Sequence, residues 1–164
     1  MDLCLHKWSW RLVLSMSKYD MVRYHQAEQK NKDMLQLLDK QLIGSTSAKA
    51  KTSPRLRMNH NFHPSLDDKV QRFINCMEPG TKEEIHHHPV DEMLIVIRGT
   101  IKAILVDDDK NVIDEKVIRP ADGVYGVQLP KNVWHTIESL EPDTCVFEVK
   151  EGPFVSHEDG GILE

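Results

Sequence analysis

The sequence predicts an all-β protein in which two sheets enclose a cavity, preceded by a short helical region. Three observations support this prediction. From residue 54 onwards, short apolar segments alternate with polar turns, a pattern typical of a sandwich or small barrel. One of the predicted strands has an entirely polar face. A cluster of histidines stands between two glycines in the middle of this region.

Composition limits the function classes that the chain can belong to. Its 164 residues suit one domain, and 40% hydrophobic residues suffice for a modest core. The net charge of −5, without a basic stripe, argues against a nucleic-acid partner. No apolar run approaches the ~20 residues of a membrane span, so we expect no membrane association. Three widely spaced cysteines indicate reduced thiols in a cytoplasmic protein.

Residues 1–22 are expected to form an extension that precedes the folded domain. They show no clear periodicity, so no regular element is assigned to them. One interpretation is that Met16 or Met21 is the true translation start. The other is a short strand or helix that packs on the barrel or on a second subunit.

A helical region is predicted for residues 23–53. Apolar residues recur there at intervals of three and four up to Ile43, as on one face of a helix. Gly44 stands where a C-terminal cap is expected. Residues 45–53 then form a second short helix or a loop, and Pro54 ends any helix.

The predicted barrel domain covers residues 54–155 and is followed by a tail, residues 156–164. A closed double-sheet jelly roll would protect the strand edges and leave a cavity for a small-molecule ligand. In chain order, the predicted strands span residues 55–63, 70–77, 85–88, 92–98, 100–106, 112–118, 124–129, 133–138 and 144–150.

The first predicted strand alternates strictly between an apolar and a polar face. Asparagine is depleted in ordinary strands, so a face of arginine, asparagine and histidine is an unusual exterior. We therefore expect this face to turn into the barrel lumen. Its members are Arg55, Arg57, Asn59, Asn61 and His63, and Gln71 and Asn75 share a face of the next strand that would extend the lining.

The histidine cluster has the spacing of a metal site. His86 and His88 are two residues apart, so on a strand both point to one face while His87 points away. Glu92 adds a carboxylate four residues after His88. Imidazoles and a carboxylate that converge from neighbouring strands bind a divalent transition metal ion. Such a donor set accepts iron, manganese, nickel or zinc, and the sequence does not select among them.

The spacing resembles the two motifs of the cupin superfamily. The first, G-x5-H-x-H-x3-E-x6-G, is complete from Gly80 onwards. In the second, Pro130 and His135 match, Ser139 replaces the usual asparagine, and Asn132 replaces a glycine whose left-handed turn asparagine can adopt. The resemblance implies a cupin fold (a double-stranded β-helix or jelly-roll barrel), often dimeric, with four metal ligands: His86, His88, Glu92 and His135.

Two further stretches resemble the WbuC family of cupin-fold metalloproteins. They are S-P-R-L-R-M-N-H-N-F-H from Ser53 and F-E-V-K-E-G-P-F from Phe147. The similarity covers about residues 33–154. Members of that family often have more residues between the His-x-His pair and the acidic residue, whereas this chain has the shorter general cupin spacing. The resemblance implies a bacterial protein linked with O-antigen or other surface polysaccharides.

Three functions are compatible with these residues. The first is a metal-dependent isomerase or epimerase for a sugar or sugar nucleotide, with the metal as Lewis acid and His63 as base. The second is an iron-dependent dioxygenase, because histidines and a carboxylate suit Fe(II) and oxygen. The third is a non-catalytic module that binds a sugar or small acid. The sequence leaves open whether the protein is an enzyme, since one fold supports many chemistries.

Within the first hypothesis, the polar strand face would hold the substrate. Arg55 and Arg57 are expected to pair with a phosphate or carboxylate, because guanidinium groups bind such anions through two hydrogen bonds. Asn59 and Asn61 would contact hydroxyl groups. A homodimer is also expected, although no particular residue of the sequence indicates the interface.

Overall fold

The computed structural model describes residues 35–81, 83–155 and 161–163. The described part of the chain contains one α-helix, one turn of 3₁₀ helix and eight strands. The helices are α3 (Lys40–Thr52) and η1 (Pro120–Asp122). The strands are β1 (Arg57–Asn61), β2 (Val70–Met77), β3 (Glu92–Arg98), β4 (Ile101–Val106), β5 (Val112–Ile118), β6 (Gly126–Leu129), β7 (His135–Ser139) and β8 (Thr144–Glu151).

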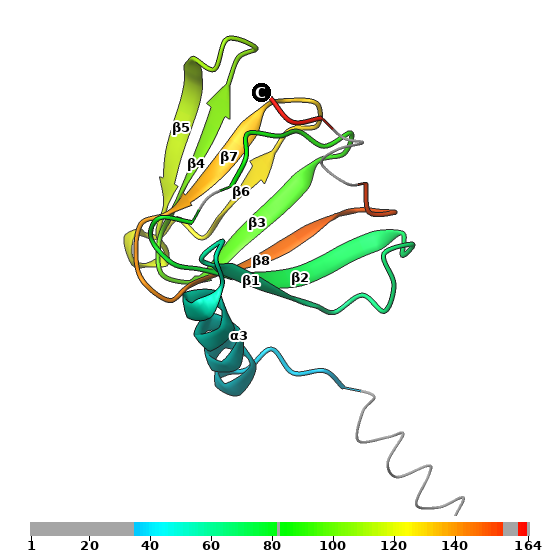
Figure 1. Ribbon diagram of the computed structural model, residues 1–164, viewed down its shortest axis with the longest axis vertical. Coiled ribbons are helices and arrows are strands. Elements are labelled where there is room, and N and C mark those ends of the chain that lie inside the picture. Colours follow the sequence, from blue (N-terminus) through cyan, green and yellow to red (C-terminus); the bar gives the residue numbers. More distant parts are fainter. Residues whose placement is uncertain (1–34, 82, 156–160, 164) are drawn as a thin grey trace, which may run out of the picture. The chain divides into compact units, whose positions relative to one another are not determined.

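The strands form two sheets, which confirms the predicted all-β jelly roll with a short helical region before it. The larger sheet has the order β1-β2-β8-β3-β6, and the smaller has the order β5-β4-β7. All neighbouring strands in both sheets pair in antiparallel fashion. Figure 1 shows the two sheets opposite each other, with α3 packed at one end of the larger sheet.

The described residues before Lys40 are not helical, and α3 continues past the predicted end of the apolar helix at Ile43. Residues 23–34 of the predicted helical region lie outside the described residues. Asp39 is the N-cap, because its carboxylate accepts a hydrogen bond from the main-chain N–H of Leu42 at 2.8 Å. The helix runs through Gly44, so the prediction of a C-terminal cap at this glycine is wrong. It ends shortly before Pro54, as predicted.

Packing on the sheet explains why the small, polar segment after Gly44 stays helical. Thr46 and Ser47 are buried together with Ile43 and Ala50, on the side of α3 that contacts β1 and β2. Small side chains let a helix approach a sheet closely, but they give no apolar stripe in the sequence. The apolar cluster beneath the helix consists of Ile43, Ala50, Ile74, Cys76 and Cys145, and both cysteines are free thiols.

The inward faces of the strands change from apolar to polar along the barrel. At one end, both sheets contribute to an apolar core: Met77, Leu94, Val96, Ile101, Ala103, Ile118, Leu129, Ile137 and Val146. Because alternate residues of a strand share a face, the face of β8 that carries Val146 continues into Glu148 and Lys150. In the same way, Glu92 of β3 precedes Leu94 on the inward face. The core and the polar end are therefore built by the same strands.

The helix and both sheets belong to one unit, which begins at residue 38. The boundaries predicted for the extension, the helical region, the barrel and the tail stay predictions. Among the described residues, no helix has the length and apolar character needed to cross a bilayer.

Replacing Gly44 with alanine is expected to raise the free energy of unfolding by about 0.5–1 kcal/mol, because glycine loses more backbone freedom in a helix. Nothing lies within 4 Å of the position that the added Cβ would take, so no clash opposes the gain. Urea denaturation would measure the change. A loss of stability would indicate that Gly44 does cap the helix.

Replacing Gly99 with alanine is expected to have the opposite effect. Its φ of +82° is left-handed, and an added Cβ would lie 2.3 Å from Thr144 Oγ1 and 2.8 Å from Thr144 Cα. The strain and the clash should lower the free energy of unfolding by at least ~2 kcal/mol. The same urea titration measures this, and a neutral result would contradict the tight turn between β3 and β4.

Candidate metal centre

Three of the predicted ligands meet at the polar end of the barrel. His135 opens β7, and His86 pairs with it through hydrogen bonds from His86 N to His135 O (3.1 Å) and from His135 N to His86 O (2.9 Å). The main-chain N–H of Asn132 also donates to His88 O at 2.7 Å. The φ of Asn132 is +58°, which confirms its predicted left-handed turn. The prediction of a strand over residues 85–88 is wrong, since only the bridging residue His86 pairs there.

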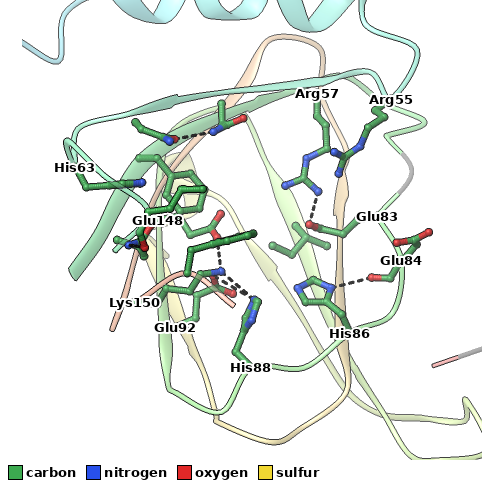
Figure 2. Close-up of a pocket in the computed structure, with 17 residues that line it drawn as sticks. Arg55, Arg57, His63, Glu83, Glu84, His86, His88, Glu92, Glu148 and Lys150 are labelled. Atoms are coloured by element: carbon green, nitrogen blue, oxygen red, sulfur yellow. Dashed lines mark hydrogen bonds and ion pairs between the residues drawn. The ribbon is translucent and has the colours of Figure 1, made fainter. Parts of the chain in front are cut away.

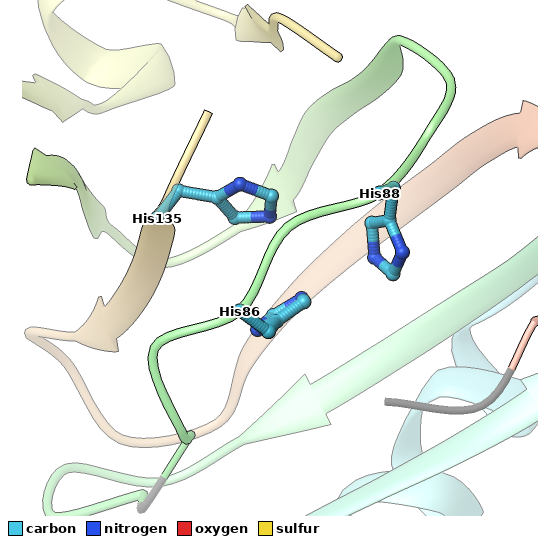
Figure 3. A group of neighbouring side chains, drawn as sticks. All are labelled: His86, His88 and His135. Atoms are coloured by element: carbon cyan, nitrogen blue, oxygen red, sulfur yellow. The ribbon is translucent and has the colours of Figure 1, made fainter. Parts of the chain in front are cut away.

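The histidine triad (His86, His88 and His135) is buried, and its rings lie close together (Figure 3). The ring centroids are 4.8 Å apart for His86 and His88 and 4.5 Å apart for His86 and His135. One nitrogen from each ring lies within 4.8 Å of the others. His87 instead packs its ring against Trp134, at 4.3 Å. The predicted alternation of the three consecutive histidines is therefore confirmed.

The chemistry of the triad fits a metal ion. Nδ1 of His86 lies 2.9 Å from Glu84 O, and Nδ1 of His135 lies 2.9 Å from Val133 O. A ring whose Nδ1–H donates to a carbonyl presents the lone pair of Nε2, as metal-binding histidines commonly do. Nε2 of His135 is buried and has no hydrogen-bond partner among the described residues. Such an arrangement suits a divalent transition metal, without selecting which one.

Glu92 lies beside the triad, at the start of β3. Its carboxylate is buried, with Oε2 3.6 Å from His135 Nε2 and Oε1 3.9 Å from His88 Nε2. Glu92 is thus close to two of the three histidines, whereas the group that can meet at one ion consists, among the described residues, of the triad; the role of Glu92 as a fourth ligand stays a prediction. Its Oε1 also accepts a hydrogen bond from Lys150 Nζ at 2.9 Å.

Lys150 connects a buried network that the sequence analysis missed. Its Nζ lies 2.9 Å from His88 Nε2 and 3.4 Å from Glu148 Oε1, in addition to the contact with Glu92. In the register of β3 and β8, Glu92 faces Lys150 and Leu94 faces Glu148. The signal was present in the sequence, because residues 146, 148 and 150 alternate on one face of a predicted strand. What was lacking was the register that places this face beside Glu92.

Burial and charge divide the protonation states within this network. Burial alone would raise the pKa of Glu92, but hydrogen bonding by Glu148 and the charge of Lys150 hold that pKa well below its usual range. Burial, followed by the charge of Glu92, raises the pKa of Glu148 well above its usual range. Burial and the charge of Lys150 lower the pKa of His88 to about 3, so its imidazole is neutral near pH 7.

Two members of the triad, His86 and His88, line a cavity of about 800 Å³ (Figure 2). The polar face of the first predicted strand lines it, which confirms that this face turns into the lumen. His63 lies across the cavity from His86, with its imidazole pointing inward (Figure 2). Its Nδ1 is 3.0 Å from both the N and the O of Arg72, and its buried Nε2 has no hydrogen-bond partner among the described residues.

Most of the other predicted substrate-binding residues line this cavity, but they differ in how available their side chains are. Arg55, Asn59 and Asn61 line its open side, and the two asparagine side chains hydrogen-bond to each other at 2.7 Å. Gln71 also lines the cavity, but its amide donates to main-chain carbonyls at 3.2 and 3.0 Å. Asn75 is buried on the same face of β2 but is not among the lining residues. The binding roles of all these side chains stay predictions.

Arg57 has a partner that the sequence analysis also missed. Its guanidinium group forms an ion pair with Glu83, and both side chains are largely buried in the cavity wall. The other oxygen of that carboxylate, Oε2, has no hydrogen-bond partner among the described residues. Glu83 carries no sequence signal of its own, because it precedes the histidines in a segment without regular structure. The pair offers a ligand both donors and an acceptor, whereas Arg55 offers donors alone.

Comparisons with known proteins show the fold and leave the activity open. The sequence matches a family described as a domain of unknown function (DUF6016) over residues 38–118. No curated protein matches it. A conserved protein of unknown function from Streptococcus pyogenes is structurally similar, with 10% identity over 75% of this chain and 92% of that one, and a TM-score of 0.51.

Two further solved structures are similar in the same way. The capsular polysaccharide assembling protein CapF from Staphylococcus aureus has 20% identity and a TM-score of 0.51, and the match covers 65% of this chain and 29% of CapF. A cupin superfamily protein from Desulfitobacterium hafniense has 13% identity and a TM-score of 0.47, over 58% of this chain and 76% of that one.

The fold and the site together define a class of protein. The chain is a cupin-type jelly-roll barrel whose polar end carries a buried triad of histidines able to hold a metal ion. The closer resemblance to the WbuC family stays a prediction.

Replacing His86 or His135 with alanine is expected to weaken metal binding by more than about 100-fold, since even residues that only orient a ligand cost 10–100-fold. Elemental analysis of the purified proteins, and titration with Zn²⁺ or Ni²⁺, would measure this. His87→Ala is the matched control, because this neighbouring ring packs outside the triad. Equal metal content in wild type and all three variants would rule out the triad as the binding site.

Proposed function

We propose that this protein is a metal-dependent enzyme that isomerises or epimerises a sugar or sugar nucleotide. One observation carries the proposal: His63, whose imidazole is a group able to transfer a proton, lines the same cavity as His86 and His88 of the triad. A metal-binding module that only held its ligand would not need a second imidazole with an unpartnered nitrogen on the opposite wall. His63 and the triad thus flank the position of a bound ligand.

The environment of His63 suits a proton shuttle. Its Nδ1 can accept from the N–H of Arg72 or donate to the carbonyl of the same residue, both at 3.0 Å. The imidazole can therefore present either a lone pair or a proton at Nε2. A group of this kind can remove a proton from one face of a carbon and return it, as isomerisation and epimerisation require. The main chain of Arg72 thereby holds the imidazole in place, while Nε2 stays available to accept or donate a proton.

The remaining lining would bind and orient the substrate. A divalent ion held by His86, His88 and His135, with Glu92 as a fourth ligand, would polarise a substrate carbonyl or a pair of hydroxyls. Arg55 on the open side would pair with a phosphate or carboxylate, and Asn59 and Asn61 would contact hydroxyls. A cavity of about 800 Å³ is large enough for a sugar and part of a nucleotide.

The biological setting is also part of the proposal. We place the reaction in the biosynthesis of surface polysaccharides such as O-antigen, because of the resemblance to the WbuC family. CapF, whose fold is similar, is described as a capsular polysaccharide assembling protein. At 20% identity that likeness concerns the fold, so the substrate has to be established by experiment.

Proton exchange would test the reaction before its product is identified. The metal-loaded protein is incubated in D₂O with a panel of sugars, sugar phosphates and nucleotide sugars, and loss of a C–H signal is followed by NMR. We expect exchange at a carbon next to a carbonyl, and His63→Asn should slow it by about 10²–10⁴-fold with metal content unchanged. His60→Asn, at an exposed position of β1 shortly before His63 in the chain, is the matched control.

Two outcomes would replace this proposal. Product formation that requires oxygen, from an iron-loaded protein, would identify a dioxygenase. Saturable ligand binding without exchange or turnover would identify a non-catalytic binding protein.

A further inference from the structure

Lys150 makes contacts that a bound metal ion would also need. Its Nζ lies 2.9 Å from His88 Nε2 and 2.9 Å from Glu92 Oε1. Its side chain is only 9% exposed, so water does not compete strongly for these contacts. Figure 2 shows the ammonium group between the two predicted ligands.

The contact with His88 excludes a metal ion at the same ring. An ammonium group has three donors and no acceptor, so the nitrogen of His88 must supply the lone pair in this hydrogen bond. A neutral imidazole has one such lone pair, because its other nitrogen carries the proton. His88 therefore cannot accept from Lys150 and bind a metal ion at the same time. Coulomb repulsion adds to this exclusion, since a buried ammonium and a divalent cation would stand a few ångströms apart with little screening.

We propose that Lys150 is a built-in competitor of the metal ion, which holds His88 and Glu92 in place until a divalent cation displaces its ammonium group. The inference rests on the proposed metal centre. It gives Lys150 a positioning role before metal binding, because the two ligands are kept beside each other although both are buried and polar. It also predicts that metal binding moves a positive charge within the cavity wall.

Two groups near Lys150 Nζ would provide alternative contacts for the displaced ammonium group. Glu148 Oε1 is already 3.4 Å from Nζ, and the ring of Phe73, which lines the cavity, lies 5.8 Å from it. The four-carbon stem of lysine is flexible, so a change of side-chain rotamer moves the charge without moving β8. After displacement, the ammonium group would lie toward Glu148 and Phe73, which both line the cavity. A negatively charged group of a substrate would then pair with it there.

Lys150→Met tests the proposal, because methionine has a similar length and carries no charge. We expect the variant to bind Zn²⁺ and Ni²⁺ at least about tenfold more tightly than wild type in competition with a chromophoric chelator. Its melting temperature without metal should fall, since Glu92 loses its ion pair. The rise in melting temperature on adding metal should therefore be larger than in wild type.

The direction of the change in metal affinity shows whether Lys150 competes with the metal ion or helps to bind it. If Lys150 instead orients Glu92 as a ligand, its loss weakens metal binding, and the proposal fails; unchanged affinity also overturns it. Lys116→Met, an exposed residue of β5, controls for the change in net charge. Lys150→Arg keeps the positive charge and should bind metal no more tightly than wild type.

A crystal structure of the wild-type protein with Zn²⁺ provides a measurement that needs no variant. We expect Nζ of Lys150 to be beyond hydrogen-bond distance of His88 Nε2, and an intact contact in a metal-loaded site would overturn the proposal. Absence of metal binding by both wild type and Lys150→Met would overturn the metal centre itself, and this inference with it. If both proteins bind metal but Lys150→Met does not bind it more tightly than wild type, only the role of Lys150 is overturned.

Discussion

A carboxylate buried inside the barrel is the constraint on which the site depends. Glu92 is 3% exposed, and an ionised group in such a place is stable only with charged or hydrogen-bonding partners. The register of β3 and β8 supplies Lys150 directly opposite, and β7 supplies His135 from the other sheet. A register shift of one residue would move the inward-facing side chains of either strand to the outer face of the sheet. The buried carboxylate would then lose the positively charged and hydrogen-bonding partners that stabilise it. The pairing of the strands and the chemistry of the site are thus fixed by the same register.

Local patterns were sufficient to predict most of the fold. The strands at residues 70–77 and 112–118 have the predicted bounds, because each is bordered by turn residues that leave little freedom. The helix was predicted poorly for a physical reason. Its buried face is built from Thr46, Ser47 and Ala50, whose burial is a property of the sheet beneath them and not of the segment itself. The segment at residues 85–88 alternates like a strand, yet only His86 finds a pairing partner.

The residues of the candidate site also fall into two groups: those that local spacing identifies, and those that only contacts distant in the sequence identify. Spacing within one segment identified His86 and His88, and a second motif identified His135. The alternation of residues 55–63 identified a face that does line the cavity. Lys150 and Glu148, by contrast, become part of the site only through pairing with a strand more than fifty residues earlier. Glu83 is recognisable only through its contact with Arg57. Residues whose function comes from a partner distant in the sequence were the ones that pattern analysis missed.

The charges around the cavity indicate the kind of ligand that the site would favour. Arg55, Arg57 and Lys150 contribute three positive charges to its lining. The carboxylates of Glu83, Glu84 and Glu92 balance them, and burial, which raises the pKa of Glu148, opposes a fourth negative charge in the lining. A divalent ion would therefore add two positive charges to this balance. An anionic ligand would restore the balance in a site with little screening. The lining therefore favours an anionic ligand over a neutral one, and under the proposed function that ligand would be a sugar phosphate, a nucleotide sugar or a sugar acid.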